Sequence, residues 1–198
     1  METTDTDLPQ RIAARVRELR SQRGLSLEAL AARAGVSRSM ISLIERGESS
    51  PTAVVLERLA TGLGVVLAHL FEPAGTALEA SASPVARHDE QTPWRDPASG
   101  YQRRNVSPAG AHPFRIVDVH FPPGARVAFE SGEREAPVHQ QVWLLEGEMD
   151  VASGAERYRL KPGDCFAMTL DAPTMFHNPT REAARYAVVI ASSSSLRR

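Results

Sequence analysis

The chain has 198 residues, of which 42% are hydrophobic and 24% are charged, and its formal net charge is -1. This length allows one large or two small domains, and the composition is that of an ordinary globular protein. The charge balance excludes a generally basic protein, so contact with nucleic acid requires a local patch. Such a patch lies between Gln10 and Leu70, where nine arginines and five glutamates give +4 and leave -5 for the remainder.

The ends and apolar runs of the chain show no targeting or membrane signal. The start, METTDTDLPQ, lacks the basic and apolar regions of a secretory signal, and the runs at 65–68 and 187–191 are too short to cross a bilayer. A single cysteine, Cys165, excludes an internal disulfide and fits a reducing compartment. We therefore expect a cytoplasmic protein without a membrane partner.

The first third of the chain predicts a bundle of five short helices over residues 9–72. Residues 1–8 are expected to form a disordered leader, and a first helix opens at Pro9 and ends near Gly24. After two further helices and a loop at 49–52, a fourth helix ends at Gly62 or Gly64. A short fifth helix is predicted over residues 65–71.

The second and third helices lie in the stretch SLEALAARAGVSRSMISLIERG, from Ser26 to Gly47. Ser26 and Ser37 are good N-caps, and Gly35 ends the first helix of the pair. Apolar residues at positions 40, 41 and 44 form the expected buried stripe of the second. Two short helices joined by a glycine-containing turn form the helix-turn-helix, which lays its second helix in the DNA major groove.

The order Leu-x-x-Leu-Ala-x-x-Ala-Gly-Val-Ser, followed by Ile-Ser-x-Ile-Glu-Arg-Gly and Pro51, closely resembles the XRE-family (Cro/C1-type) repressor DNA-binding domain. The resemblance covers about residues 11–71. It implies that base edges are reached by Ser37, Arg38, Ser39 and Ser42, and phosphates by Ser26, Arg46 and Ser50. We expect Arg38 to read guanine, because its guanidinium can pair with O6 and N7 together.

Other residues of this region are expected to have structural roles. Glu45 should close the next loop, since a carboxylate would repel the DNA backbone, and Arg11 and Arg15 should belong to a solvated face. Leu43 stands where relatives can use a polar base-reading side chain, so the contact set is not carried over completely. Because one such domain contacts few base pairs, we expect a homodimer on a palindromic operator with half-sites ~34 Å apart.

Residues 73–99 have the Ala, Ser, Gly and Pro content of a linker, except that Trp94 should pack onto the domain that follows. From 100 to 192 the chain becomes a series of short β-type runs separated by turn residues, which predicts a closed barrel or a jelly-roll sandwich, with 193–198 as a tail. The predicted strands are 101–106, 114–121, 126–130, 140–145, 148–152, 156–160, 165–168, 174–177 and 186–190.

This half carries a second resemblance. The runs Val142-Trp-Leu-Leu-Glu-Gly-Glu-Met, Arg159-Leu-Lys-Pro-Gly-Asp and Leu170-Asp-Ala-Pro resemble the two motifs of the cupin superfamily. The whole chain therefore resembles a class of small bacterial regulators of mixed α plus all-β class, with a repressor-like helical head joined to a cupin barrel. The resemblance implies that the cupin senses a ligand or forms the dimer.

Cupin enzymes hold a divalent metal with His and Glu side chains, and the resemblance places these ligands at Ala136, Gln140 and Thr174. None of the three is a good ligand for such a metal, so we expect no metal and no cofactor. His139 and His177 are each displaced by three residues from a ligand position and should face outward.

A pocket can survive the loss of its metal. The residues expected to share the inward face, and thus to line a small-molecule pocket or simply to fill the interior, are Gln140, Val142, Leu144, Thr174, Phe176 and Asn178. Both alternatives stay open at this stage. Cys165, next to Phe166 in a strand, is expected to be a buried small residue rather than a redox sensor.

Three functions compete. The first is a dimeric, sequence-specific transcriptional regulator that is not an enzyme and whose cupin half senses an unknown small molecule. The second is an iron-dependent cupin oxygenase or epoxidase, because the hydroxypropylphosphonate epoxidase family also joins a repressor-like domain to a cupin, although Ala136, Gln140 and Thr174 argue against it. The third is an antitoxin-like or scaffold protein.

Overall fold

The computed structural model describes residues 7–72, 83–110, 113–132 and 136–192. Residues 1–6 of the predicted leader (1–8), residues 73–82 of the predicted linker (73–99) and the predicted tail (193–198) lie outside the described residues. The chain divides into two compact units. The helical unit contains the residues before Val85 and the short segment Pro108–Gly110, and the sheet unit contains the remainder. Each unit is described by itself below.

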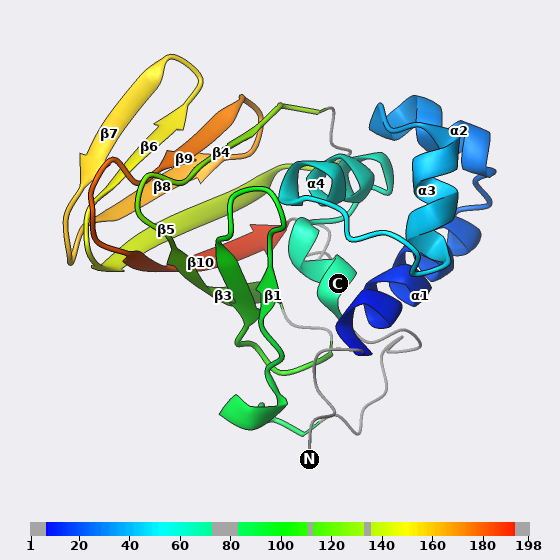
Figure 1. Cartoon of the computed structure of the whole chain (residues 1–198), viewed down its shortest axis with the longest axis horizontal. Helices are drawn as coiled ribbons and strands as arrows, with labels where there is room; N and C mark the ends of the chain where they lie inside the picture. Colours follow the sequence, from blue (N-terminus) through cyan, green and yellow to red (C-terminus); the bar gives the residue numbers. More distant parts are fainter. Residues whose placement is uncertain (1–6, 73–82, 111–112, 133–135, 193–198) are drawn as a thin grey trace. The chain divides into compact units, whose positions relative to one another are not determined.

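The helical unit has four α-helices in its described residues, followed by a 3-10 turn (Figure 1). Its elements are α1 (Asp7–Gln22), α2 (Leu27–Ala34), α3 (Arg38–Glu45), α4 (Ala53–Gly62) and the 3-10 turn Leu67–Phe71. The prediction of a fifth α-helix is therefore wrong. Val66 lacks a side chain that can cap the turn, and five residues are too few to nucleate an isolated α-helix. α1 also begins two residues before the predicted Pro9.

The core of this unit forms where one apolar stripe of each helix meets the others. α1 packs against α3 and the 3-10 turn, and α2 packs against α3 and α4. The side chains with almost no exposure are Val16, Leu30, Ile41, Ile44, Leu56, Leu59, Leu63 and Leu70. Gly62 permits the close approach of α4 to α2, because an added Cβ would lie 2.9 Å from Ala34 Cβ.

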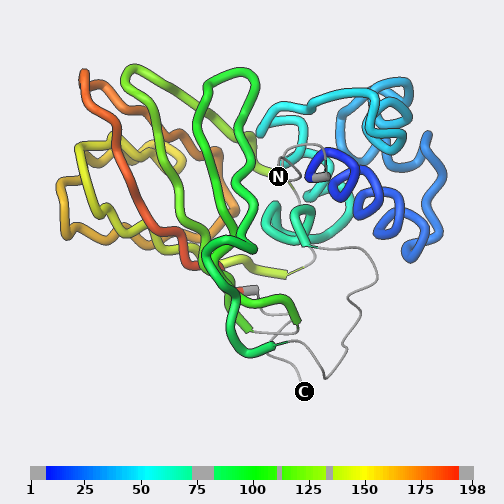
Figure 2. Tube along the Cα trace, turned by 60° about the horizontal axis from the view of Figure 1, so that its bottom comes forward, coloured from blue at the N-terminus to red at the C-terminus, as the bar shows by residue number. Residues whose placement is uncertain are grey.

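The described residues of the sheet unit form ten strands in two antiparallel sheets. The strands are β1 (Trp94–Arg95), β2 (Gln102–Asn105), β3 (Phe114–Phe121), β4 (Arg126–Phe129), β5 (Val138–Glu146), β6 (Met149–Ser153), β7 (Glu156–Leu160), β8 (Cys165–Thr169), β9 (Thr174–His177) and β10 (Ala184–Ser192). The larger sheet has the order β1-β2-β3-β10-β5-β8, and the smaller has the order β4-β9-β6-β7. In Figure 2 the red β10 runs beside the yellow-green β5, to which it is hydrogen-bonded.

The two sheets face each other across a core that contains a continuous series of aromatic rings. Phe176 of the smaller sheet stacks on Tyr186 of the larger sheet, with centroids 5.8 Å apart and planes 5° from parallel. Tyr186 contacts Phe121, and Phe121 stacks on Tyr101. The described strands thus form a two-sheet sandwich, the jelly-roll alternative of the prediction, and no closed barrel is present among them.

The end of the predicted linker belongs to the sheet unit. Residues 94–95 form β1 at the edge of the larger sheet, a strand that the sequence did not predict. Trp94 is 8% exposed and packs edge-to-face on Tyr101 with ring centroids 5.9 Å apart. The expectation that Trp94 packs onto the following domain is confirmed.

Candidate functional site

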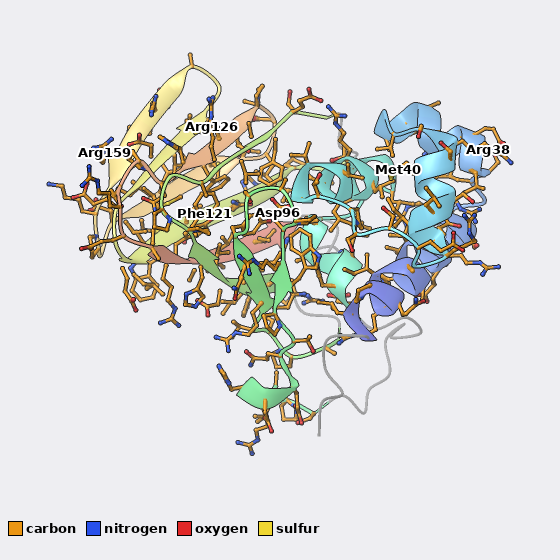
Figure 3. All side chains as sticks on the ribbon, in the orientation of Figure 1. Arg38, Met40, Asp96, Phe121, Arg126 and Arg159 are labelled. Atoms are coloured by element: carbon orange, nitrogen blue, oxygen red, sulfur yellow. The ribbon has the colours of Figure 1, made fainter. Side chains whose placement is uncertain are left out.

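The recognition helix α3 is set in place by its cap and its buried face. Ser37 has extended backbone angles, and its hydroxyl accepts a hydrogen bond from the Met40 N–H at 3.2 Å. Ile41 and Ile44 are 0% and 1% exposed and anchor the helix to the core, whereas Met40 is only half-buried. The side chains of Arg38 and Met40 leave the helix on opposite sides (Figure 3). One face of α3 is therefore free to meet a ligand.

The helix before it is capped in the same way. The Ser26 hydroxyl accepts from the Ala29 N–H at 3.0 Å, and Gly35 ends α2 with a left-handed φ of 60°. These two features hold α2 and α3 in the predicted helix-turn-helix arrangement. Ser26 and Ser37 thus have a structural role beside the DNA contact predicted for each.

Glu45 links α3 to α1 through a half-buried ion pair. Arg20 Nε and Nη2 donate to the two carboxylate oxygens of Glu45 at 2.6 and 2.8 Å, and Arg20 Nη1 donates to the Leu25 carbonyl. The hydrogen bond from Arg20 to Glu45 raises the pKa of the guanidinium. The prediction that Glu45 is structural is confirmed, but its bond ties α3 to α1 instead of closing the next loop.

Two other arginines of α1 were expected on a solvated face, and this expectation is wrong. Arg11 donates to the Phe71 carbonyl at 3.4 Å, and Arg15 donates to the His69 carbonyl at 3.2 Å. Arg15 also pairs with Glu18 at 2.8 Å. Both side chains fasten α1 to the 3-10 turn, so they are half-buried and serve the fold.

The residues predicted to touch DNA are all at least partly exposed. Ser37, Ser39 and Ser50 are exposed, Ser42 is half-buried, and the Arg38 side chain is 65% exposed. Arg46 follows α3 with a side chain that is 50% exposed, and Ser26 is exposed at the start of α2. All seven thus keep solvent-accessible surface.

Two glutamates that sequence reasoning assigned no role hold the two arginines of this set. Glu28 of α2 forms an ion pair with Arg38, with Oε1 2.5 Å from Nε. Glu48 accepts from Arg46 Nε and Nη2 at 2.9 and 2.8 Å. A hydrogen bond from its own backbone N–H, together with Ser26 and Arg38, lowers the pKa of Glu28, and the Arg46 hydrogen bond lowers that of Glu48.

In the sheet unit, all six residues predicted to face inward are buried. β5 alternates buried and exposed side chains from Val138 to Leu144, as the predicted parity requires. The exposed fractions are 9% for Gln140, 1% for Val142, 0% for Leu144, 6% for Thr174, 6% for Phe176 and 0% for Asn178. Inward orientation is therefore confirmed, and the remaining question is which of the six reaches a ligand.

Two of the six are fully committed to the fold. The Asn178 amide donates to the Phe121 and Glu182 carbonyls, and its oxygen accepts from the Thr180 N–H and hydroxyl. Phe176 lies in the aromatic core. By contrast, neither the Gln140 amide nor the Thr174 hydroxyl makes a side-chain hydrogen bond within the described residues.

A pocket of about 420 Å³ opens at the end of β5 and β8. Its lining residues are Ser131, Gly132, Ala136, Pro137, Val138, Thr169, Leu170 and Asp171. None of the six predicted residues lines it, although Ala136, a predicted ligand position of a cupin metal, does. The interior pocket prediction thus differs from the cavity that the structure shows at this edge.

The positions where the resemblance predicts metal ligands do not fit a metal here. The side chains there are those of Ala136, Gln140 and Thr174, and no group of three or more His, Cys, Asp and Glu residues comes together within the described residues. His139 is exposed on the outer face of β5, opposite Gln140. His177 is half-buried with its Nδ1 3.6 Å from Asp150 Oδ2, on the outer face of the smaller sheet.

Asp150 itself is nearly buried beneath two arginines of β7. Arg159 Nε and Arg157 Nη2 donate to its carboxylate at 2.8 and 2.6 Å. The hydrogen bonds from Arg159 and then from Arg157 lower the pKa of Asp150 to about 2. The group is a structural ion cluster on a β-sheet surface.

The outer face of the larger sheet carries apolar side chains that the sequence reasoning did not single out. Trp143 and Phe114 are 50% and 49% exposed, and Ile116, Ala187 and Val189 lie on the same face between them by strand register. Strand periodicity signals this for Trp143, because it alternates with the inward residues 142 and 144. Cys165, paired with Trp143 across β5 and β8, is exposed, so the expectation that it is buried is wrong.

Comparisons with known proteins agree with the helical unit's geometry. A family model described as a helix-turn-helix domain matches residues 11–72. The helix-turn-helix-type transcriptional regulator SutR of Escherichia coli is 26% identical over 91% of this chain and 94% of that protein. The regulator y4dJ of Sinorhizobium fredii is 36% identical, over 34% of this chain and 87% of that protein.

A solved structure extends the likeness to both units. The crystal structure of an HTH_3 family transcriptional regulator from Vibrio cholerae aligns over 95% of this chain and 98% of its own, with a TM-score of 0.74 and 27% identity. No helix in the described part of the chain is long and apolar enough to span a membrane. The chain belongs to the helix-turn-helix family of transcriptional regulators, and its likeness to the Vibrio cholerae regulator extends over the sheet unit on its C-terminal side.

Proposed function

We propose that the chain is a cytoplasmic, sequence-specific DNA-binding regulator that acts as a homodimer, is not an enzyme and responds to a small molecule through its sheet unit. The observation that carries the DNA-binding part is the exposed face of α3, where Ser37, Arg38 and Ser39 surround the start of a firmly anchored recognition helix. The net +4 of residues 10–70 supports it, since phosphates dominate the affinity of such proteins.

The contacts divide into those that specify and those that position. Arg38 can place two N–H groups on guanine O6 and N7, and Ser37, Ser39 and Ser42 offer hydroxyls to neighbouring base edges. Ser26, Ser50 and Arg46 flank α3 and serve the phosphates. Each good bidentate base contact is worth about 1–3 kcal/mol of discrimination.

The test selects bound fragments from random DNA and compares Arg38→Ala with Arg17→Ala. Arg17 is an exposed arginine of α1 outside the proposed contact surface, so both variants lose one positive charge. Arg38→Ala should lose the preference for one base pair and about 10- to 100-fold in affinity for the selected sequence. Equal losses in both variants, or the absence of any enriched sequence for the wild type, would contradict the proposal.

For the dimer, we propose the outer face of the larger sheet. Two-fold symmetry lets the same patch serve both copies, and exposed aromatic side chains such as Trp143 and Phe114 are enriched in such contacts, while Asp118 and Gln141 lie on the same face by register. Sedimentation should show a wild-type dimer and a monomeric Trp143→Arg variant, while Val85→Arg, at an apolar residue that is 47% exposed outside the strands, should stay dimeric. A dimeric Trp143→Arg variant would show that the dimer interface lies elsewhere.

For the small molecule, we propose the interior at Gln140 and Thr174. Their side chains are 9% and 6% exposed and make no hydrogen bonds within the described residues, so each can offer a donor and an acceptor to a ligand. If Gln140 and Thr174 line the site, a metabolite that changes the release of the wild-type protein from DNA should have no such effect on Gln140→Leu or Thr174→Val. If instead they fill space, each variant should only change stability by less than about 1.5 kcal/mol.

The proposed site needs no metal, because its three ligand positions hold Ala, Gln and Thr. Elemental analysis of protein purified without chelators should find less than a stoichiometric amount of iron or zinc. A stoichiometric metal that is lost in Thr174→Val would support the oxygenase alternative instead.

A further inference from the structure

The two arginines of the DNA-reading surface are held by glutamates in different ways. Arg38 is held through Nε alone, which lies 2.5 Å from Glu28 Oε1, and it has no other ion pair in the described part of the chain. Arg46 has a bond at each of its three nitrogens, because Nε and Nη2 donate to Glu48 and Nη1 donates to Ser42 Oγ at 2.5 Å. The first arrangement leaves the two terminal nitrogens of the guanidinium without a hydrogen bond, and the second leaves one N–H on each of them.

Neither pair is explained by stability of the fold. The side chains of Glu28 and Arg38 are 64% and 65% exposed, and those of Glu48 and Arg46 are 54% and 50% exposed. Exposed pairs of this kind contribute ~0–1 kcal/mol, because water and salt screen them. The Arg20–Glu45 pair, with side chains 17% and 8% exposed, already joins the helices.

We propose that Glu28 is a positioning residue that presents Arg38 to guanine, whereas Glu48 withholds Arg46 from phosphate until DNA displaces it. The inference deepens the proposed function and rests on it. It assigns opposite effects to two glutamates of equal charge on the same surface.

The positioning role of Glu28 follows from the geometry of guanine recognition. Guanine O6 and N7 accept from two N–H groups of one guanidinium, and Nη1 and Nη2 of Arg38 supply such a pair while Nε stays with Glu28. A free arginine has about 2 kcal/mol of rotamer entropy to lose, and holding it in advance lowers that cost on binding. Glu28 lies in the first turn of α2, whose cap at Ser26 fixes its backbone.

The role of Glu48 follows from competition between its carboxylate and a DNA phosphate for Arg46. A phosphate competes with Glu48 and Ser42 for Arg46, because three of the five guanidinium N–H groups are already bonded to them, and Glu48 then lies near the phosphate as a like charge. Glu48 should therefore weaken binding to every sequence about equally, since phosphates carry no base information. The net charge that the surface offers to DNA is lower by about one.

The experiment compares Glu28→Gln and Glu48→Gln, which remove the same charge and keep side-chain size. The probe is the duplex selected from random DNA by the wild-type chain, and a second duplex in which the base pair identified by the Arg38→Ala variant is changed. Affinity is measured over a range of salt concentrations, and thermal unfolding confirms that both variants remain within about 0.5 kcal/mol of wild type.

Glu28→Gln should lose about 5- to 10-fold in affinity for the selected duplex and much less for the changed duplex, with a salt slope no shallower than that of the wild type. In an Arg38→Ala background the same substitution should have no further effect on base preference. Glu48→Gln should gain about 2- to 5-fold on both duplexes, and its salt slope should steepen by about 0.9.

Three outcomes would contradict these roles. If Glu28→Gln strengthens binding to both duplexes as Glu48→Gln does, the carboxylate competes with DNA and the positioning role is wrong. If Glu48→Gln leaves affinity and salt slope unchanged, Arg46 is not withheld. If the wild type enriches no sequence at all, the proposed function fails and this inference fails with it.

Discussion

The helical unit and the sheet unit keep the polar side chains of interest in opposite places. In the helical unit the residues predicted to contact DNA project from α3 and its flanks, and the half-buried ion pair Arg20–Glu45 lies beneath them. In the sheet unit the six residues predicted to line a pocket are at most 9% exposed. A polar side chain on the exposed face of a capped helix can bind a ligand directly. A polar side chain inside a sandwich can do so only where its hydrogen bonds are not already made within the fold.

Asn178 and Gln140 show this distinction inside the sheet unit. Both are inward amides, but the Asn178 amide is bonded to the Phe121 and Glu182 carbonyls and its oxygen accepts from Thr180. It closes the connection from β9 to β10 and is unavailable to a ligand. Gln140 has no such bonds in the described residues, which is why the proposed site includes it and leaves Asn178 out.

The largest expected effect tests whether Phe176 belongs to the packed core of the two-sheet sandwich. Phe176 stacks on Tyr186 and meets Phe129 edge-to-face at 6.3 Å. Phe176→Ala should lower the free energy of unfolding of the sheet unit by about 3–5 kcal/mol. Both tryptophans, Trp94 and Trp143, are in this unit, so fluorescence during urea unfolding reports on it selectively. A loss under about 1 kcal/mol, with new binding of small apolar molecules, would show that the ring only covers a cavity.

The next effect concerns the half-buried pair under the recognition surface. Glu45→Ala leaves the Arg20 guanidinium without its carboxylate, with only the bond to the Leu25 carbonyl remaining among those described above. The helical unit should lose about 2–4 kcal/mol, measured by circular dichroism during unfolding. Glu48→Ala is the matched control, because its exposed pair with Arg46 should change stability by less than about 0.5 kcal/mol. Equal losses of stability in the two variants would mean that the contribution of these ion pairs does not depend on their exposure.

The sequence predicted the parts of this structure that depend on local spacing. The caps at Ser26 and Ser37 and the inward parity of β5 follow from periods of 3.6 and 2 and from hydroxyl chemistry, and all are confirmed. Cys165 was expected to be buried because neighbouring Phe166 suggested a core strand, but β8 is the edge of its sheet and leaves Cys165 exposed.

Long-range pairing explains the other differences. Nothing in the spacing of Arg11 and Arg15 indicates that they reach the carbonyls of Phe71 and His69, because these are distant in sequence. The same holds for Glu28 and Arg38, which meet only after α2 and α3 fold together. Charge pairs between elements depend on tertiary geometry, so their roles required the structure.

A smaller effect is expected from the ion cluster on the outer face of the smaller sheet. Asp150 has a folded pKa of about 2, below its ordinary 3.8, so its contribution is complete above the unfolded value and is lost as pH falls toward 2. Since Arg157 and Arg159 are 56% and 51% exposed, solvent screens the pairs, and we expect a loss of about 1–2 kcal/mol between pH 5 and pH 2.

Urea unfolding followed by tryptophan fluorescence at a series of pH values measures that loss for the sheet unit. In Asp150→Asn the stability at neutral pH should be lower and this component of the pH dependence should disappear. If the variant keeps the full acid dependence of the wild type, other carboxylates are responsible and the cluster has no such role.

The smallest effect separates a cap from a DNA contact. Ser37 and Thr52 cap α3 and α4 in the same manner, accepting from Met40 N–H at 3.2 Å and from Val55 N–H at 3.4 Å. Ser37→Ala and Thr52→Ala should therefore each lower the stability of the helical unit by about 1 kcal/mol. Under conditions where both variants are fully folded, only Ser37→Ala should also weaken binding to the selected duplex, because only Ser37 stands at the exposed start of α3. Equal DNA affinity in the two variants would restrict Ser37 to its cap, and the reading of bases would then depend on Arg38, Ser39 and Ser42.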